Sequence, residues 1–329
     1  MEYRRLGRTG LQVSRVCLGT VYFGSGVPEA EATRIVDRAI DLGINFVDTA
    51  EIYQRPAFGA AEEALGRALR GRRDEVVLAT KARYDPGAFR TGTPADRSLT
   101  RRDVMRGIEI SLRRLQTDHV DLYYPHHVDP VTPIEETLRA FDDLVHQGKV
   151  RYIGLSNFGA WQTVEALWAA DRGRLASPVC VQTLYNLLDR SVEADLLPAC
   201  ARFGLSLVPY SPLAGGVLTG KYRAGAEPPA SSRAAYLGGV RDRGRPGHVP
   251  VASERNVAVA ERLAGWAGER GLTAAHVALA WCLRRPEVAS AIMGASTVAQ
   301  LEENAPAFDL VLSDEQVGEI EALLDGSPR

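Results

Sequence analysis

The feature that most constrains this 329-residue chain is a regular alternation of short apolar runs with longer amphipathic runs. Each short run has the length and β-branched content of a buried strand, and each longer run has the period of about 3.6 residues that is typical of a helix. The expected strands cover eight ranges, 16–19, 44–48, 76–80, 120–124, 152–155, 179–182, 205–209 and 290–293. The expected helices cover 29–42, 60–70, 101–115, 134–147, 160–170, 193–203, a pair within 254–284, and 298–304.

Eight successive strand and helix units favour an α/β fold of the (β/α)8 TIM-barrel type over a doubly wound open sheet, which usually has fewer repeats. Barrels of about 250 residues or more form one unit, so we expect a single domain over 1–329. Residues 3–14 have two β-like halves around Gly7–Gly10, which predicts a hairpin that plugs one end of the barrel. Residues 313–324 predict an extra C-terminal helix.

Two long insertions follow predicted strands, one over 84–100 and a Gly- and Pro-rich one over 213–250. Loops of this length are often functional, and the loops after the strands build the catalytic face of a barrel. We therefore expect both insertions to cover a substrate or a cofactor. The alternative is that they are ordinary surface insertions.

Composition excludes several classes of protein. A net charge of -2, with arginines interleaved among acids, gives no basic surface for nucleic acid. The sequence has no apolar run near the ~20 residues that span a bilayer, and its start lacks the apolar core of a signal peptide. The four cysteines lie far apart, which predicts buried free thiols in a reducing compartment. We expect a cytoplasmic globular protein without a membrane partner.

Ionisable residues stand where the second and third predicted strands leave the core. Asp48 ends one strand, Tyr53 follows it, and Lys81 ends the next strand. The chain has 39 basic residues but only three lysines, at 81, 149 and 221. A lysine retained at a strand end indicates a requirement that the planar, permanently charged guanidinium of arginine cannot meet. The structural alternatives are an ordinary strand-end cation for Lys81, a rim aromatic for Tyr53 and a loop cap for Asp48 with Thr49.

The fourth predicted strand runs into Pro125-His126-His127-Val-Asp129. Two histidines and a nearby aspartate could suggest a metal site. Adjacent residues on a strand point to opposite faces, however, and the spacing implies no third ligand. We expect no metal here.

These segments resemble the catalytic segments of the aldo-keto reductases. The similarity is clearest in Val47-Asp-Thr-Ala-x-x-Tyr53 and in Asp121-Leu-Tyr, which leads to His126. The resemblance implies that Asp48, Tyr53, Lys81 and His126 form the catalytic tetrad of a carbonyl reductase. Tyr53 would then be the proton donor, Lys81 would favour its phenolate, Asp48 would orient Lys81, and His126 would hold the carbonyl oxygen.

Polar and aromatic residues at the ends of the fifth, sixth and seventh predicted strands are suited to a nicotinamide ring and its carboxamide. Their order matches the family. By this resemblance the residues that hold the nicotinamide are Ser156, Asn157, Gln182 and Tyr210, with Ser211 and Leu213 nearby. A dinucleotide-binding G-x-G-x-x-G pattern is not found after a strand, and Gly215–Lys221 lacks the Ser or Thr that a phosphate loop requires after its lysine.

Residues 292–304 resemble the segment of the family that binds the adenosine phosphate. The implied cofactor residues there are Gly294, Ser296, Gln300, Glu303 and Asn304. Gly294 and Gln300 replace the Lys and Arg of tight NADP binders, a pattern closer to the branch with the potassium-channel β subunits and bacterial relatives. In that branch the long loop supplies the charge, so Lys221 and Arg233 are expected to reach the phosphates. NADPH is therefore favoured over NADH.

The leading hypothesis is an NADPH-dependent reductase of an aldehyde, ketone or keto sugar. One alternative is a nicotinamide-binding, redox-sensing regulatory subunit with little turnover, and another is a metal-dependent barrel hydrolase that functions without Tyr53. Gln54 replaces a glycine that usually follows the tyrosine, which would reshape the substrate mouth. The residues expected to line a pocket for a carbohydrate or polyketide are Tyr22, Phe23, Tyr84, His127 and the loop 223–245.

Overall fold

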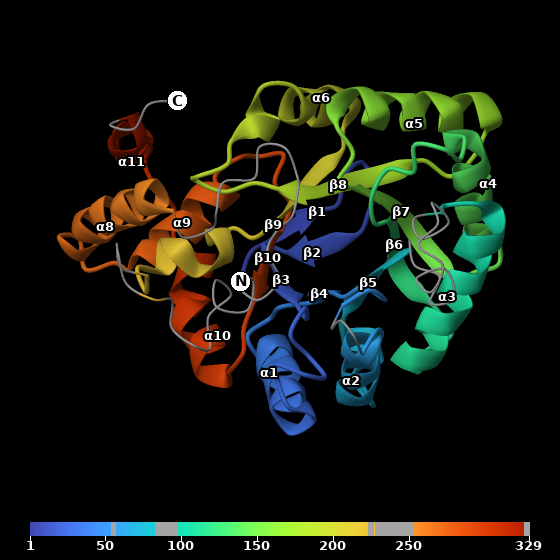
Figure 1. Ribbon diagram of the computed structural model, residues 1–329, viewed down its shortest axis with the longest axis horizontal. Helices are drawn as coiled ribbons and strands as arrows, with labels where there is room; N and C mark the ends of the chain where they lie inside the picture. Colours follow the sequence, from blue (N-terminus) through green and yellow to red (C-terminus); the bar gives the residue numbers. More distant parts are fainter. Residues whose placement is uncertain (54–56, 83–97, 223–226, 228–252, 326–329) are drawn as a thin grey trace.

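Eight parallel strands close into a barrel at the centre of the molecule (Figure 1). The structure is a computed structural model that describes residues 1–53, 57–82, 98–222, 227 and 253–325. The barrel strands are β3 (Val16–Gly19), β4 (Phe46–Asp48), β5 (Val77–Ala82), β6 (Val120–Pro125), β7 (Val150–Ser156), β8 (Pro178–Leu184), β9 (Ser206–Tyr210) and β10 (Ala291–Gly294). The predicted (β/α)8 barrel is confirmed, and each predicted strand is found within two residues at either end.

Helices surround the barrel (Figure 1), and most of them are amphipathic, whereas the helix Ala274–Leu283 is apolar and almost fully buried. They are α1 (Glu29–Asp41), α2 (Ala60–Ala68), α3 (Arg101–Leu115), α4 (Ile134–His146), α5 (Ala160–Gly173), α6 (Leu196–Phe203), α8 (Glu254–Gly268), α9 (Ala274–Leu283), α10 (Val298–Asn304) and α11 (Asp314–Asp325). The predicted helix from residue 193 begins later than expected. Residues Ser191–Glu193 form a 3-10 turn, and α6 begins after Asp195, whose carboxylate accepts the backbone N–H of Leu196.

The side chains of the barrel strands alternate between two apolar layers, because successive residues of a strand point to opposite sides. Leu78 and Tyr123 point outward and pack beneath the helices in the larger core cluster. Ala79 and Leu122 point inward and belong to a second cluster that fills the barrel. Burying a side chain of leucine size contributes about 1.5–3 kcal/mol, so both layers stabilise the closed sheet.

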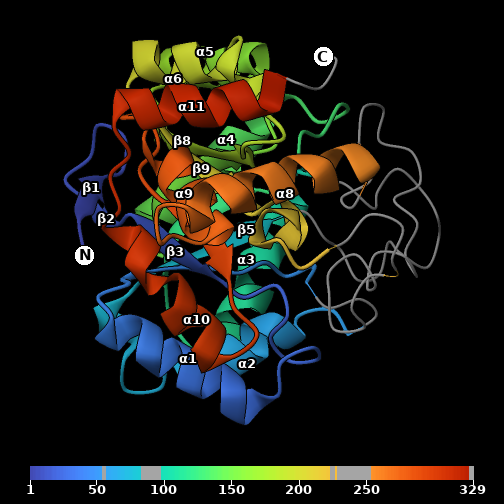
Figure 2. The same cartoon turned by 90° about the vertical axis from the view of Figure 1, so that its left-hand side faces the viewer.

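The predicted N-terminal hairpin is confirmed and closes the end of the barrel where the strands begin (Figure 2). It consists of β1 (Tyr3–Arg5) and β2 (Gln12–Ser14). Leu6 and Val13 are fully buried in the cluster that fills the barrel. The backbone N–H of Gly7 donates to Ser206 Oγ of β9 at 2.8 Å. Because this end is plugged, the ends of the strands on the opposite face are left to form a site.

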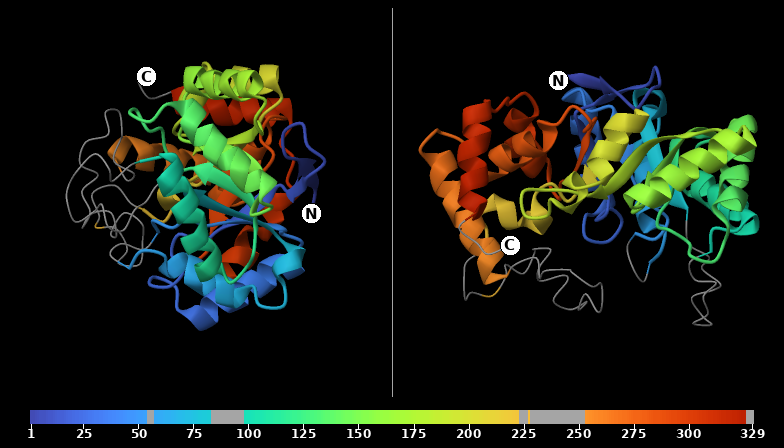
Figure 3. Two further views of the ribbon diagram at one scale, coloured as in Figure 1. Left: turned by 90° about the vertical axis from the view of Figure 1, so that its right-hand side faces the viewer. Right: turned by 90° about the horizontal axis from the view of Figure 1, so that it is seen from above.

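The C-terminal helices pack together beside the barrel. The extra helix α11 is confirmed and contacts α8, which in turn contacts α9 (Figures 1 and 3). All four cysteines are buried free thiols, as predicted. Among the described residues, none of the helices is both long and apolar enough to cross a membrane.

Candidate active site

Strand periodicity brings the candidate residues to the barrel axis. Phe46 and Ala79 point into the barrel, so Asp48 and Lys81, two positions further along β4 and β5, point inward as well. The same spacing from Cys180 and Val208 turns Gln182 and Tyr210 inward at the ends of β8 and β9. Residues far apart in the sequence therefore converge at the face opposite the hairpin.

Lys81 is the centre of this convergence. Its side chain is fully buried, and its Nζ donates to Asp48 Oδ1 at 2.5 Å, to the carbonyl oxygen of Thr49 at 2.8 Å and to the hydroxyl oxygen of Tyr53 at 3.0 Å. An ammonium has three donors, and all three are used. Since the Tyr53 oxygen accepts from Lys81, the proton of that hydroxyl points away from the lysine. Three of the four predicted tetrad residues are thus in direct contact.

The charge of Lys81 is maintained by its partners in spite of burial. Loss of solvent acts to lower the pKa of Lys81, but the carboxylate of Asp48 and the oxygen of Tyr53 outweigh it and raise that pKa above its ordinary value. Asp48 is also buried, so each ion is the main compensation for the other. Removing one partner of such a pair typically costs about 3–5 kcal/mol.

His126, the fourth predicted residue, lies beside Tyr53. The two rings meet edge to face, with 6.1 Å between their centroids and an interplanar angle of 79°. The expectation that His126 and His127 point to opposite faces is wrong: their rings stack 5.0 Å apart at 13°. The reason is that β6 ends at Pro125, so both histidines lie in the bend after the strand. In the described part of the chain, no three His, Cys, Asp or Glu side chains form a group that could hold a metal.

A buried floor beneath Lys81 was not identified from the sequence. Tyr124 pairs with Lys81 across β5 and β6, and its ring centre is 6.0 Å from Lys81 Nζ. The Tyr124 hydroxyl lies 3.6 Å from Cys180 Sγ. Burial raises the pKa of Tyr124 well above its usual range and that of Cys180 to about 12. These groups are neutral at physiological pH, so Asp48 supplies the negative charge that faces Lys81. Tyr123 and Tyr124 are adjacent in β6, and the sequence alone does not distinguish the ring that points into the barrel from the ring that points outward.

Asn157 connects three strand ends beside the tetrad. Its Nδ2 donates to the carbonyl oxygen of His126 at 2.9 Å and to Ser156 Oγ at 3.1 Å, while its Oδ1 accepts the Tyr210 hydroxyl at 2.9 Å. Asn157 has a backbone φ of 60°, a conformation that asparagine tolerates better than most residues. The structure therefore brings together Ser156, Asn157 and Tyr210, as their order in the sequence predicted.

Gln182 makes a contact that was not anticipated. Its Nε2 donates to Asp48 Oδ2 at 2.8 Å, from β8 across the barrel to β4. The side chain is 2% exposed. Gln182 is therefore joined to the tetrad itself.

The segment after β9 is held in an unusual backbone shape. Ser211 has a φ of 55°, and its carbonyl oxygen accepts Asn186 Nδ2 at 3.0 Å. Leu213 precedes the short helix η5 (Ala214–Thr219). The aliphatic end of Lys221 lies against Gly216, where an added Cβ would be 2.6 Å from Lys221 Cε. Arg233, the second predicted phosphate ligand, lies outside the described residues.

The predicted adenosine-phosphate residues gather at the end of β10 and along α10. The backbone N–H of Ser296 donates to Gln300 Oε1 at 2.8 Å, and Asn304 Nδ2 donates to the carbonyl oxygen of Gln300 at 2.8 Å. Gly294 and Glu303 are exposed at this place. The structure gives no direct contact between this group and the tetrad within the described chain.

The residues predicted to line a substrate pocket differ in their exposure. Phe23 is fully buried in the core and cannot line an open pocket, so that expectation is wrong. Phe23 lies in a tight turn directly after the buried strand β3, and this turn directs its ring into the core. Tyr22 and His127 are partly exposed. Gln54, Tyr84 and the loop 223–245 lie outside the described residues.

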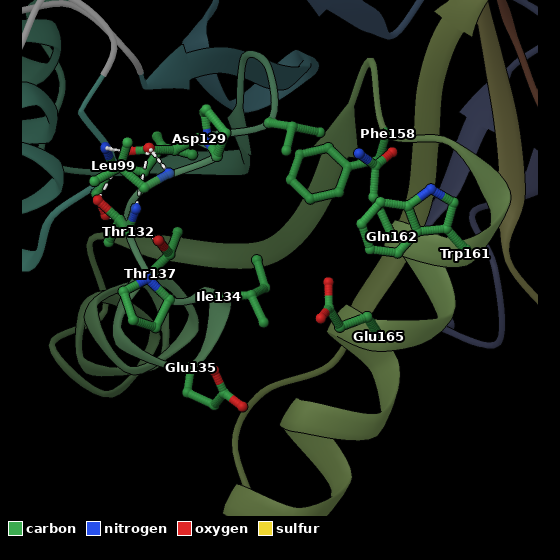
Figure 4. A pocket seen from close by; sticks show the side chains of 14 residues that line it. Leu99, Asp129, Thr132, Ile134, Glu135, Thr137, Phe158, Trp161, Gln162 and Glu165 are labelled. Atoms are coloured by element: carbon green, nitrogen blue, oxygen red, sulfur yellow. Dashed lines mark hydrogen bonds between the residues drawn. The ribbon is translucent and has the colours of Figure 1, made fainter. Parts of the chain in front are cut away.

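A separate cavity of about 400 Å³ lies between α4 and the start of α5 (Figure 4). Ile134, Phe158 and Trp161 form apolar walls, and Glu165 points into it. Asp129 lies at its edge, where its carboxylate accepts the backbone N–H groups of Leu99 at 2.7 Å and Val131 at 2.9 Å. No tetrad residue is among the described residues that line this cavity.

Comparison with known proteins agrees with this geometry. The family model "Aldo/keto reductase family" matches residues 15–325. An uncharacterized oxidoreductase of Bacillus subtilis, YrpG, is 41% identical over 321 residues, which cover 96% of this chain and 93% of that protein. Probable voltage-gated potassium channel subunits beta from Oryza sativa and Arabidopsis thaliana are each 38% identical over 100% of this chain and 98% of their own length. The chain therefore belongs to the aldo/keto reductase family of oxidoreductases.

Proposed function

We propose that the protein uses NADPH to reduce an aldehyde, a ketone or a keto sugar to the alcohol, with Tyr53 as the proton donor. The observation that carries this proposal is the contact of Lys81 with Tyr53, in which the ammonium donates to the phenol oxygen at 3.0 Å. A phenol has an ordinary pKa of about 10 and is a reluctant acid. A cation in contact with its oxygen stabilises the phenolate that remains when the proton leaves.

Each residue of the tetrad has its own role in the proposed reduction. A nicotinamide cofactor held by this site would supply the hydride, with its electron pair, for the carbonyl carbon. The carbonyl π electrons move to oxygen, which takes the proton of Tyr53, and solvent later reprotonates the Tyr53 phenolate. His126, edge-on to Tyr53, donates a hydrogen bond to the same oxygen as its charge grows. Asp48 keeps Lys81 charged and in place.

The described residues have the hydrogen-bonding capacity that a nicotinamide needs. Asn157 Oδ1 accepts one bond from Tyr210 and has a second lone pair for an amide N–H. Ser156 offers a hydroxyl donor for the carboxamide oxygen, and Tyr210 offers a ring to stack on. Lys221, with Arg233, is assigned to the phosphates, and the residues of α10 to the adenosine.

A regulatory subunit with little turnover is the less favoured alternative. Two relatives are named as potassium channel subunits, but those names describe the relatives and do not assign that role to this chain. The contacts from Asp48 through Lys81 to Tyr53 are complete, which favours proton delivery to a substrate.

The test is oxidation of NADPH, followed by its absorbance, over a panel of aromatic aldehydes, simple ketones and keto sugars with NADH in parallel. We expect turnover on at least one carbonyl, faster with NADPH. Quenching of cofactor fluorescence without turnover on any member would reject the reductase and support the binding subunit.

A further inference from the structure

Gln182 holds the oxygen of Asp48 that Lys81 does not use. Lys81 Nζ is bonded to Oδ1, and Gln182 Nε2 is bonded to Oδ2 at 2.8 Å. The two donors come from β5, which pairs with β4, and from β8, which lies across the barrel from β4. Their hydrogen bonds fix both ends of the carboxylate. Without the second donor the carboxylate is free to rotate, because the terminal torsion of aspartate has a broad energy minimum.

The orientation of the Gln182 amide follows from charge. Its oxygen cannot face the carboxylate of Asp48 without repulsion, so the NH₂ group must face it and Oε1 must point away. Gln182 is 2% exposed, so water does not replace a missing donor easily. A hydrogen bond to a charged, buried group is among the stronger ones in proteins.

We infer that Gln182 is a positioning residue for proton transfer: by donating to Asp48 Oδ2 it fixes the Asp48 carboxylate, which in turn fixes Lys81 against Tyr53. This rests on the proposed function, in which Tyr53 is the proton donor. It adds a role distinct from holding the nicotinamide. A cofactor ligand acts on affinity, whereas a residue that aligns the ion pair acts on the rate at saturating cofactor.

Replacing Gln182 by glutamate gives a test specific to the donated hydrogen bond. The introduced side chain has the same shape, but it can donate to Asp48 only when its carboxyl is protonated. When ionised, it places a second carboxylate beside the first and repels it. Asp48, which Gln182 contacts, is hydrogen-bonded to Lys81, and Lys81 to Tyr53. The other titratable groups around them are Cys17, Tyr124 and Cys180, which interact electrostatically with Asp48, and His126, which lies beside Tyr53.

We expect kcat of Gln182→Glu, relative to the unmodified protein, to be strongly reduced at pH 8 and to rise as the pH falls through the titration of the carboxyl pair. Gln182→Met, which has similar volume but no donor, should lose about 10- to 100-fold in kcat at every pH, the size expected for a bond to a charged group. Ser156→Ala is the matched control. It removes a carboxamide partner that does not contact Asp48, so it should weaken cofactor binding without such a pH-dependent recovery.

Thermal stability gives a readout that does not depend on turnover. The melting temperature of Gln182→Glu should approach that of the unmodified protein as the pH is lowered from 8 to 5, because protonation of the introduced carboxyl restores the donor. Normal kcat of Gln182→Met at saturating cofactor overturns the inference, and so does a melting deficit of Gln182→Glu that does not change with pH. Failure of the reductase proposal looks different: the unmodified protein would then reduce no carbonyl, whereas the melting experiment would still report on the bond to Asp48.

Discussion

The ammonium of Lys81 donates a hydrogen bond of 3.0 Å to the hydroxyl oxygen of Tyr53, and the lysine side chain is fully buried. The ring centre of Tyr53 is 5.0 Å from the same nitrogen. In this arrangement the charge of Lys81 and the acidity of Tyr53 are coupled. Each change to the pair should therefore alter both the rate and its dependence on pH.

Replacing Lys81 by methionine should slow reduction and move the alkaline limb of the kcat profile to higher pH. Without the cation the phenolate is less stable, so the pKa of Tyr53 rises and its proton is retained to higher pH. The variant also leaves Asp48 buried without its cation, which should cost about 3–5 kcal/mol of unfolding free energy. The double variant Lys81→Met/Asp48→Asn is the control: it should recover stability but not turnover. An unchanged pH profile in Lys81→Met would contradict the coupling.

Tyr53→Phe should lose about 10²- to 10⁴-fold in kcat, the usual contribution of a positioned general acid. The phenylalanine ring keeps the shape of the site, so the dissociation constant of NADPH, measured by fluorescence quenching, should stay the same. Turnover close to normal in this variant would reject Tyr53 as the proton donor.

Asp129→Asn should loosen the contact between Leu99 and the segment after β6. Burial acts to raise the pKa of Asp129, but hydrogen bonds from Leu99, Val131 and Thr132 together lower it below the usual value. A carboxyl group whose pKa is lower in the folded than in the unfolded protein stabilises the fold at pH values above its unfolded pKa of about 3.9. This stabilisation is lost as the pH falls through the pKa of the folded protein. The asparagine should therefore cost about 1–3 kcal/mol at neutral pH and less in acid.

The check for Asp129 is urea unfolding at several pH values, with Asp171→Asn as the control. Asp171 is exposed in the last turn of α5, so its replacement should change stability by about 0.5 kcal/mol or less. Equal effects of the two changes would show that the hydrogen bonds at Asp129 contribute little.

Gly154→Ala should destabilise the protein by about 1–3 kcal/mol through overpacking. The added Cβ would lie 2.3 Å from a ring carbon of Tyr124 and 2.9 Å from Cys180 Sγ, in the floor beneath Lys81. Gly265→Ala in α8 is the matched control, because no atom lies within 4 Å of its added Cβ and helices favour alanine over glycine. Melting temperatures should fall for the first variant and be equal or higher for the second.

Arg233→Ala should reduce the preference for NADPH over NADH, since the phosphate that distinguishes the two cofactors would lose a cation. Lys221→Ala should weaken the binding of both cofactors, because Lys221 is assigned to the phosphates that NADPH and NADH share. Dissociation constants for each cofactor, measured in parallel, separate the two effects. An unchanged preference in Arg233→Ala would reject this source of specificity. The same measurement on Arg102→Ala, an exposed position on α3, controls for the loss of net charge.

Local sequence determined the architecture of this protein. Each strand and helix has a periodicity of its own, and eight repeats leave few folds other than a closed barrel. Strand ends also pointed to Asp48 and Lys81, because an ionisable residue directly after an apolar run lies at the face where the strands end. Tyr53 and His126 required the resemblance to a family, since a loop has no period from which its position can be inferred.

Tertiary structure decided the contacts between elements. The sequence assigned Gln182 to a cofactor, and only the closure of the barrel brings its amide to Asp48, 134 residues away in the chain. The register of β5 against β6 places Tyr124 beside Lys81, and the end of β6 at Pro125 lets two adjacent histidines stack. Sequence patterns report which side of an element a residue faces. The distance between side chains on different elements depends on strand register and on where each strand stops, and both are set by packing of the whole barrel.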